Sequence, residues 1–249
     1  MPFSYFTTYI SGIELEYAFR FPDTINYLGK SLVKTIEKSS LPIFVSDFDF
    51  EEWEKAGNPI NAFAEYSLLH LPTSTYLLNY DRFIFHAVAL RWHDKAWLIT
   101  AFPGVGKSTQ YRNLKELYPK EISIINGDKP ILELKEDGTF MVHPSPWNGK
   151  EHWCGAESAP LAGIICLRQG KENIIQRVTA KEVVSQIYIG IHHTYETEKT
   201  IQQAAKMASL LLKNYPVWML TNLGDLDSSS LLYNTISAWE KEQNHEVQA

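Results

Sequence analysis

The sequence predicts an α/β (α+β) fold in which helices flank a mixed sheet, with a small β-rich lobe over residues 1–80 before a larger domain over residues 81–249. The first observation is size, because a chain of 249 residues that is 45% hydrophobic can bury a large core without disulfides. The second is the alternation of strand-like and helix-like segments through the larger domain. The third is the richness of residues 5–21 in Tyr, Phe, Thr and Ile, which suits strands.

Short helices are expected to follow the first strands of the N-terminal lobe. Acidic residues occupy the start of the segment 49–53, as in the first turn of a helix. Apolar residues recur at helical spacing over 61–78, with Pro72 as an interruption. The apolar runs 83–90 and 96–100 then predict a hairpin that leads into the sheet core.

Strands and helices are expected to be mixed along the rest of the larger domain. The expected strands are 122–125, 131–134, 140–143, 161–167, 174–178 and 217–220. The expected helices are 107–117, 180–190, 199–213 and 228–242. The strand at 174–178 is expected to pair with the strand at 161–167. Such a mixture predicts a sheet with helices on its faces.

Composition and charge exclude several classes of protein. The chain has 23 Lys and Arg against 29 Asp and Glu, a formal net charge of −6, which argues against a nucleic-acid-binding protein. Its N-terminus lacks the features of a signal peptide, and no apolar run is long enough to cross a bilayer. We therefore expect a cytoplasmic protein with no membrane partner and free thiols at Cys154 and Cys166. The sequence is compatible with an oligomer.

A glycine-rich segment over residues 101–109 follows one predicted strand and precedes a predicted helix. It matches the phosphate-binding loop pattern G-x-x-x-x-G-K-S/T, except that Ala101 stands at the first glycine. Ala101 is tolerable there if its φ is negative. Gly104 and Gly106 allow the backbone to turn successive N–H groups toward an anion, and the following helix adds the positive end of its dipole. The segment therefore predicts a nucleotide-phosphate site.

Each residue type in this loop suits Mg-ATP. The Lys107 ammonium can reach the β- and γ-phosphates, and the Ser108 hydroxyl is the expected magnesium ligand. The residues predicted to bind the nucleotide are Pro103, Gly104, Val105, Gly106, Lys107, Ser108 and Thr109.

Two further residues are catalytic candidates together with Lys107. Asp128 lies as far after Lys107 as His86 lies before it. A carboxylate at the exit of the strand 122–125 could hold magnesium beside Ser108 or accept a hydroxyl proton, whereas the alternative is a simple turn residue. His86 lies in an apolar strand, so it is either a catalytic group or a core histidine.

The order of these features resembles the HPr kinase/phosphorylase family, whose compact P-loop core is shared with the phosphoenolpyruvate carboxykinases. The resemblance rests on His86-Ala87-Val88-Ala89-Leu90, the loop 101–109 and the strand ending at Asp128. The segments 143–152 and 215–220 resemble the short carboxykinase-like branch of this group. The resemblance implies a kinase-like domain over 81–249 that uses Mg-ATP to phosphorylate a serine in a peptide, in a protein or free. It also implies that a histidine and an aspartate flank the acceptor hydroxyl.

The sequence departs from the family at Gly127, where those kinases have the first of two adjacent aspartates. One carboxylate then remains for metal binding and proton acceptance. Either His86 takes the proton, or a distant acid contributes, or catalysis is slow or absent. The family's signature for docking HPr is not recognisable, and neither is the second metal site of the carboxykinases. Neither HPr phosphorylation nor decarboxylation is therefore expected.

The segment 144–153 is the predicted acceptor side, where Lys150 and His152 offer positive charge. The alternative is a surface turn whose tryptophans pack on the sheet. Arg168 ends an apolar strand and would either stabilise a phosphoryl group or form a surface ion pair. The function predicted from these residues is phosphoryl transfer to a hydroxyl acceptor, most simply serine. The alternatives are a nucleotide-binding accessory protein that recognises a peptide or partner enzyme, and a degenerate fold used for assembly.

Overall fold

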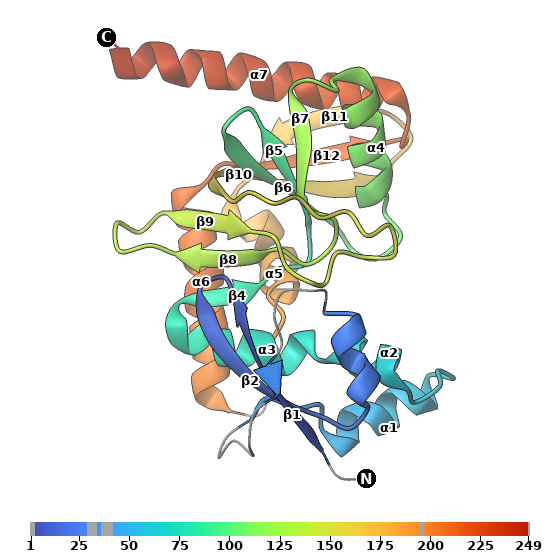
Figure 1. The fold of residues 1–249 in the computed structure, drawn as a ribbon. Helices are drawn as coiled ribbons and strands as arrows, with labels where there is room; N and C mark the ends of the chain where they lie inside the picture. The colour runs from blue at the N-terminus through green and yellow to red at the C-terminus, as the bar shows by residue number, and fades with distance from the viewer. Residues whose placement is uncertain (1–2, 29–33, 36–41, 195–196, 249) are drawn as a thin grey trace.

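The computed structural model describes residues 3–28, 34–35, 42–194 and 197–248. A small N-terminal sheet and three short helices pack against one end of a nine-stranded mixed sheet, which carries longer helices on both faces (Figure 1). The expected fold class, a mixed sheet with flanking helices, is confirmed. No helix among the described residues has the length and apolar character that crossing a bilayer requires.

The N-terminal part contains helices as well as the expected strands. Its sheet has the order β2-β1-β3, and the two longer strands form an antiparallel hairpin around Ser11 and Gly12, both of which have positive φ. The strands are β1 (Ser4–Ile10), β2 (Ile13–Phe19) and β3 (Lys34–Thr35). The helical elements are η1 (Pro22–Asn26), α1 (Asp47–Lys55), α2 (Ala62–Leu68), α3 (His70–Leu77) and η2 (Leu78–Tyr80).

Side-chain caps determine where the first two α-helices begin. Ser46 accepts a hydrogen bond from the backbone N–H of Asp49 at the start of α1, and Asn61 does the same for Ala64 at the start of α2. The break between α2 and α3 lies at Leu69, so the interruption expected in this segment occurs before Pro72 and not at it. Pro72 itself lies in the first turn of α3, where its missing N–H costs no helical hydrogen bond.

The large sheet has the strand order β4-β8-β9-β10-β6-β5-β7, with β12 beside β10 and β11 beside β12. Its strands are β4 (Arg82–Ile84), β5 (Val88–Trp92), β6 (Lys95–Thr100), β7 (Ile122–Asn126), β8 (Ile131–Leu134), β9 (Phe140–His143), β10 (Ala159–Gln169), β11 (Ile174–Arg177) and β12 (Val217–Asn222). The helices that cover it are α4 (Lys107–Leu117), α5 (Ala180–Gly190), α6 (Glu198–Asn214) and α7 (Leu226–Gln248).

The hairpin expected from 83–90 and 96–100 is confirmed for its second part, because β5 pairs antiparallel with β6, and with β7 on its other edge. The start of the run forms a separate strand, β4, which pairs with β8. The partner expected for the strand at 174–178 is wrong. The strand at 174–178, observed as β11, pairs with β12 and not with β10. Parallel pairing with β6 and β12 occupies both edges of β10 along its buried half, so no edge remains there for β11.

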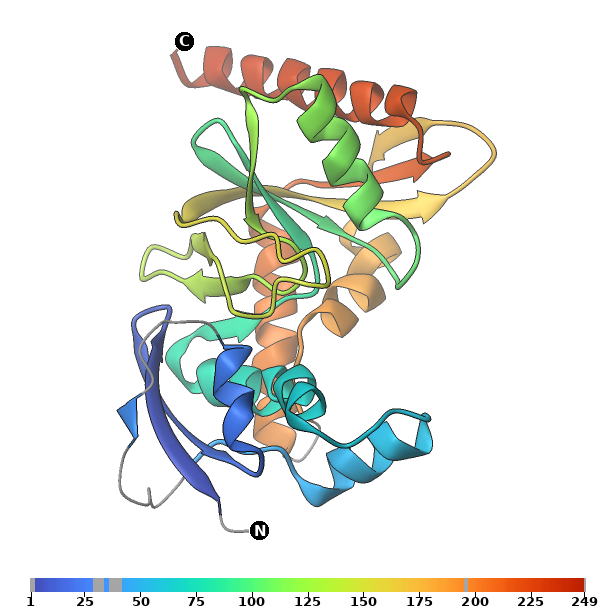
Figure 2. The ribbon, with the colours of Figure 1, turned by 45° about the vertical axis from the view of Figure 1, so that its right-hand side comes forward.

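Helices α4 and α7 lie on one side of the large sheet, and α5 and α6 lie on the other (Figure 2). Alternating side chains along the strands divide the core into two layers. Val88 and Leu90 of β5 face α4 and α7, whereas Ala89 between them faces α5 and α6. A third cluster joins the N-terminal part to the sheet, because Phe19 and Phe50 pack in the same cluster as Ile84, Ile131 and Trp147. This third cluster lies beside the loops that carry the candidate site.

Candidate functional site

The predicted phosphate loop connects β6 to α4. Gly104 and Gly106 have φ of +80° and +112°, a region that favours glycine, and neither position has a neighbouring atom where a Cβ would lie. Gly106 is the N-cap of α4, so the free N–H groups of the first helical turn face the loop. Ala101 is buried and has no positive φ, which explains why alanine is accommodated at the first glycine of the pattern.

Lys107 lies in the mouth of this loop. Its Nζ donates a hydrogen bond to the carbonyl oxygen of Ala101 at 3.4 Å. Burial lowers the pKa of the ammonium, while the negative charge of Asp128 opposes that shift and the positive charge of Lys129 adds to it. An anion in the loop would replace the hydration that the half-buried ammonium has lost.

The loop forms one wall of a cavity of about 480 Å³, here called the phosphate cavity. From the loop and α4 it is lined by Gly104, Gly106, Lys107, Ser108, Thr109 and Arg112. The opposite wall consists of Gly127, Asp128, Gly149, Lys150 and Glu151. The structure therefore brings together three sequence-predicted features, the loop, Asp128 and Lys150.

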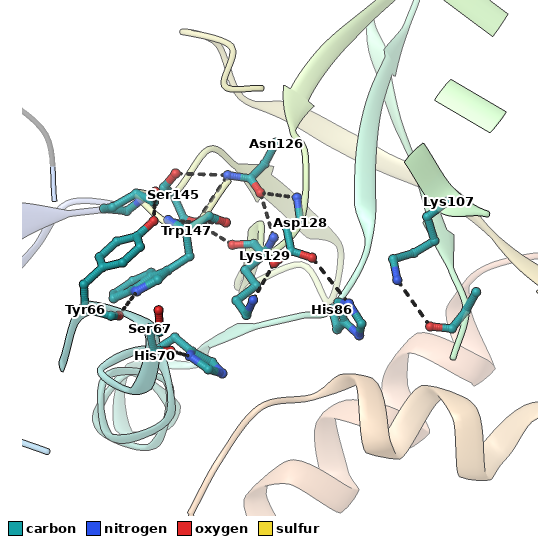
Figure 3. A network of polar contacts seen from close by, with 12 residues as sticks. Tyr66, Ser67, His70, His86, Lys107, Asn126, Asp128, Lys129, Ser145 and Trp147 are labelled. Atoms are coloured by element: carbon teal, nitrogen blue, oxygen red, sulfur yellow. Dashed lines mark hydrogen bonds and ion pairs between the residues drawn. The ribbon is translucent and has the colours of Figure 1, made fainter. Parts of the chain in front are cut away.

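Asp128 lies in a tight turn that Asn126 organises at the end of β7 (Figure 3). The Asn126 side-chain oxygen accepts from the backbone N–H groups of Asp128, at 3.0 Å, and Lys129, at 2.8 Å. Its amide nitrogen donates to the carbonyl oxygen of Ser145 at 3.0 Å, which joins the turn to the segment 144–153. Asp128 is thus a turn residue, which was the alternative to a functional role, and it also lines the phosphate cavity.

The Asp128 carboxylate lies between the side chains of His86 and Lys129. Its Oδ1 lies 3.4 Å from Nε2 of His86, and its Oδ2 accepts from the ammonium of Lys129. Burial raises the pKa of Asp128, but the hydrogen bonds to His86 and Lys129 and the charge of Lys129 outweigh it and hold the pKa well below its usual range. The group is ionised at neutral pH. His86 lies between β4 and β5, where its backbone N–H donates to Gly190 at the end of α5.

Two further imidazoles extend inward from His86. The ring of His192 lies 5.7 Å from that of His86 and 4.5 Å from that of His70, measured between centroids. Burial lowers the pKa of His70 to about 3 and that of His192 to about 2, so both are neutral at pH 7. No group of three or more His, Cys, Asp or Glu side chains that could hold a metal ion occurs in the described ranges. We interpret both histidines as packing residues behind His86.

Gly127 leaves room for the segment 144–153. Its backbone N–H donates to the carbonyl oxygen of Trp153 at 2.8 Å. A Cβ at Gly127 would lie 2.7 Å from the carbonyl oxygen of Asn148 and 3.0 Å from Cβ of Trp153. The close approach of this segment therefore means that a side chain at position 127 would force the neighbouring backbone to shift.

Gly127→Asp is expected to destabilise the fold and not to add a catalytic carboxylate. The clash arises at Cβ, so Gly127→Ala should cause a similar loss, about 1–3 kcal/mol in the free energy of unfolding. Thermal unfolding of both variants beside the wild type measures this. A Gly127→Asp protein as stable as the wild type would show that the 144–153 segment does not pack against this turn.

A second carboxylate reaches the phosphate cavity from the segment 144–153. Glu151 is largely buried and accepts from Arg112 at 3.1 Å. Gly149 lies between the two acids, since a Cβ there would lie 3.8 Å from Cγ of Asp128 and 3.6 Å from Oε2 of Glu151. Glu151 is therefore the second carboxylate of the phosphate cavity and a candidate for the distant acid that the sequence left open.

The remaining predicted site residues differ in their placement. Lys150 lines the phosphate cavity and also an adjoining cavity of about 540 Å³, here called the aromatic cavity, which His152 lines as well. The Arg168 guanidinium donates to the Thr221 hydroxyl at 2.9 Å and lines neither cavity. Trp153 packs on Tyr111, with ring centroids 4.7 Å apart, so the packing role considered for these tryptophans also holds.

Comparisons with known proteins show a distant similarity of fold. No protein-family model matches the chain. Curated proteins also yield no match. Among solved structures, an HPr(Ser) kinase/phosphatase from Coxiella burnetii is similar over 63% of this chain and 98% of its own, with 13% sequence identity and a TM-score of 0.37. This is a distant similarity of fold.

Several site residues were not predicted from the sequence. Lys129 directly follows Asp128 and could have been noticed as its ion-pair partner, and Glu151 lies beside Lys150 in the segment already singled out. His70 and His192 carry no local signal. They reach His86 only because α3 and the end of α5 pack beside β4, where the backbone N–H of His192 donates to Ile84.

Proposed function

We propose that this protein transfers a phosphoryl group from Mg-ATP to a hydroxyl acceptor, a serine in a peptide, in a protein or free. The observation that supports this best is the phosphate cavity, in which an anion-binding loop faces Asp128 and Glu151. Phosphoryl transfer depends mainly on positioning and electrostatic stabilisation. A backbone cradle, one lysine and two carboxylates supply those two requirements.

The residues present suit Mg-ATP. Gly104 and Gly106 leave open space where an anion would approach the backbone, and Lys107 supplies a positive charge beside it. Ser108 and the two carboxylates offer the oxygen ligands that magnesium prefers. When bound, magnesium neutralises charge on the phosphates during transfer. Arg112 lines the same wall and holds Glu151 in place.

We assign the orientation of the acceptor hydroxyl to Asp128. Asp128 lines both the phosphate cavity and the aromatic cavity, whereas His86 lines neither. A carboxylate at the junction can accept a hydrogen bond from a hydroxyl in the aromatic cavity and receive its proton as the phosphoryl group arrives. His86 and Lys129 keep the carboxylate ionised and oriented.

Glu151→Gln is expected to raise the magnesium concentration needed for tight nucleotide binding by about tenfold, because it removes one of the two anionic oxygen donors in the cavity. Titration of ATP at several magnesium concentrations measures the shift. Glu157→Gln is a matched control, since Glu157 also pairs with an arginine, Arg91, but lies outside the cavity. Equal magnesium dependence in the two variants would remove Glu151 from the metal site.

The proposed transfer is tested by incubating the protein with Mg-ATP and serine-containing peptides or free serine. Acceptor-dependent formation of ADP together with a phosphoserine signal by phosphorus-31 NMR would support transfer. ATP consumption that no acceptor stimulates would argue against it. A Lys107→Ala protein run in parallel excludes a contaminating kinase, since its activity should be absent.

A second candidate function is nucleotide-dependent recognition of a peptide or partner enzyme with little turnover. The pairing of Asp128 with Lys129 favours it, because the ion pair reduces the negative charge available for metal binding, and Gly127 leaves no second aspartate in the turn. Tight Mg-ATP binding without acceptor-dependent ADP formation would support this function over transfer.

A further inference from the structure

The phosphate cavity is one end of a longer groove. The aromatic cavity shares Asp128, Gly149 and Lys150 with it. A third cavity of about 310 Å³ shares Tyr27, Pro146 and Asn148 with the aromatic cavity and reaches the β1–β2 turn at Ser11. The groove therefore runs from the phosphate loop between the N-terminal part and the segment 144–153.

Four aromatic rings form one wall of the middle cavity. Tyr66 stacks on Tyr27, with centroids 5.4 Å apart, and on Trp147, with centroids 6.3 Å apart. Phe63 contacts Tyr27 edge-on at 5.7 Å and Tyr66 at 6.2 Å. Such a continuous set of rings favours contact with an aromatic or large apolar group of a ligand.

Several rings at the rim of the groove are exposed to water. The exposed fraction is 62% for Tyr9, 44% for Tyr27 and 50% for Phe63. All three line the aromatic cavity or the third cavity. Grouped aromatic exposure beside a cavity is typical of a binding surface, because covering the rings releases water from apolar area.

The aromatic wall is held firmly in place. The buried carboxylate of Glu65 accepts from the backbone N–H groups of Arg20 and Phe21 and from the Thr24 hydroxyl, which ties α2 to η1. Within the same wall, the Trp147 indole donates to the Tyr66 carbonyl oxygen at 2.8 Å, and the Tyr66 hydroxyl donates to the Pro146 carbonyl oxygen at 3.0 Å. A wall fixed in this way loses little conformational entropy when a ligand binds.

Basic side chains lie along the same cavity. Lys129, Lys150 and His152 contribute to its lining. Lys150 is exposed and forms no ion pair with the described residues. The aromatic cavity thus combines apolar contact with positive charge that would attract acidic or carboxylate groups.

We propose that this groove binds an extended peptide and places an aromatic side chain of that peptide next to the acceptor hydroxyl at Asp128. The position of the hydroxyl rests on the proposed phosphoryl transfer. Free serine has no group for the four rings and leaves the third cavity without a role. An extended peptide contacts all three cavities at once, and acidic residues in it would face Lys150 and His152.

The peptide preference is tested with a library of short peptides that have a central serine and random flanking residues. After incubation with Mg-ATP, the phosphorylated peptides are isolated and sequenced. We expect Phe, Tyr and Trp to be enriched beside the serine. Phe63→Ala and Tyr27→Ala should each remove most of that enrichment, whereas Phe48→Ala should retain it, because Phe48 is an exposed aromatic on α1 that lines none of the three cavities.

A second library with alanine in place of serine separates this proposal from the proposed transfer. Immobilised protein should select the same aromatic flanks, and Phe63→Ala should weaken binding of the selected peptides about tenfold. Binding that selects aromatic flanking residues, without phosphorylation of the serine library, would contradict the proposed phosphoryl transfer and would support the peptide groove. Phosphorylation or binding with no aromatic preference, or a preference that Phe63→Ala and Tyr27→Ala leave intact, would overturn the groove. Turnover of free serine or a small alcohol at a higher kcat/KM than any peptide would do the same.

Discussion

Mg-ATP binding is expected to weaken by about a hundredfold or more when Lys107 is replaced by alanine. The Lys107 ammonium is half-buried in the mouth of the loop, where burial already lowers its pKa. Hydrogen bonds between charged groups contribute about 1.5–3 kcal/mol each, and this residue can reach two phosphates. The loss should therefore exceed that for any exposed lysine nearby.

Isothermal titration calorimetry of Mg-ATP into the wild type and the variant measures this effect. Lys120→Ala is the matched control, because Lys120 is exposed beyond the end of α4 and does not line the cavity. Lys107→Arg should bind with intermediate affinity, since the guanidinium keeps the charge but not the shape. Equal affinity of Lys107→Ala and the wild type would show that the loop does not hold the phosphates.

Local patterns in the sequence predicted the strand, the glycine turn and the helix of the 101–109 loop. The loop is continuous in sequence, and its chemistry depends on glycines and a helix start that neighbouring residues determine. For the same reason the bounds expected for α4, β8 and β9 are those observed. Asp128 was predicted as a candidate site residue because it lies in a turn directly after a recognisable buried strand.

The acceptor side depends on contacts between distant segments, which one sequence does not reveal. Tyr27, Phe63 and Trp147 form one wall only because η1 and α2 pack against the segment 144–153. The N-terminal residues were expected to form a β-rich lobe, and their aromatic residues carried no sign of a site. The need for glycine at position 127 could not be predicted either. It depends on the closeness of Asn148 and Trp153 and not on the neighbours of Gly127 in the chain.

Asp128→Asn is expected to lower kcat by about a thousandfold while Mg-free nucleotide binding stays within a few-fold of the wild type. An amide can still accept a hydrogen bond from the hydroxyl, but it cannot take the proton. His86→Ala should lower kcat by only about ten- to a hundredfold, because His86 orients Asp128 from outside both cavities. A larger loss of kcat in His86→Ala than in Asp128→Asn would show that His86, and not Asp128, accepts the proton.

The pH dependence of kcat tests the role of Asp128 independently. Hydrogen bonds and the Lys129 charge keep the pKa of Asp128 well below its usual range against the opposing effect of burial, so its proton-accepting form persists as the pH falls through 6 and 5. If Asp128 accepts the proton, kcat of the wild type should stay nearly level between about pH 7 and 5, where an ordinary histidine titrates. A fall of kcat across that interval would show that a group other than Asp128 accepts the proton.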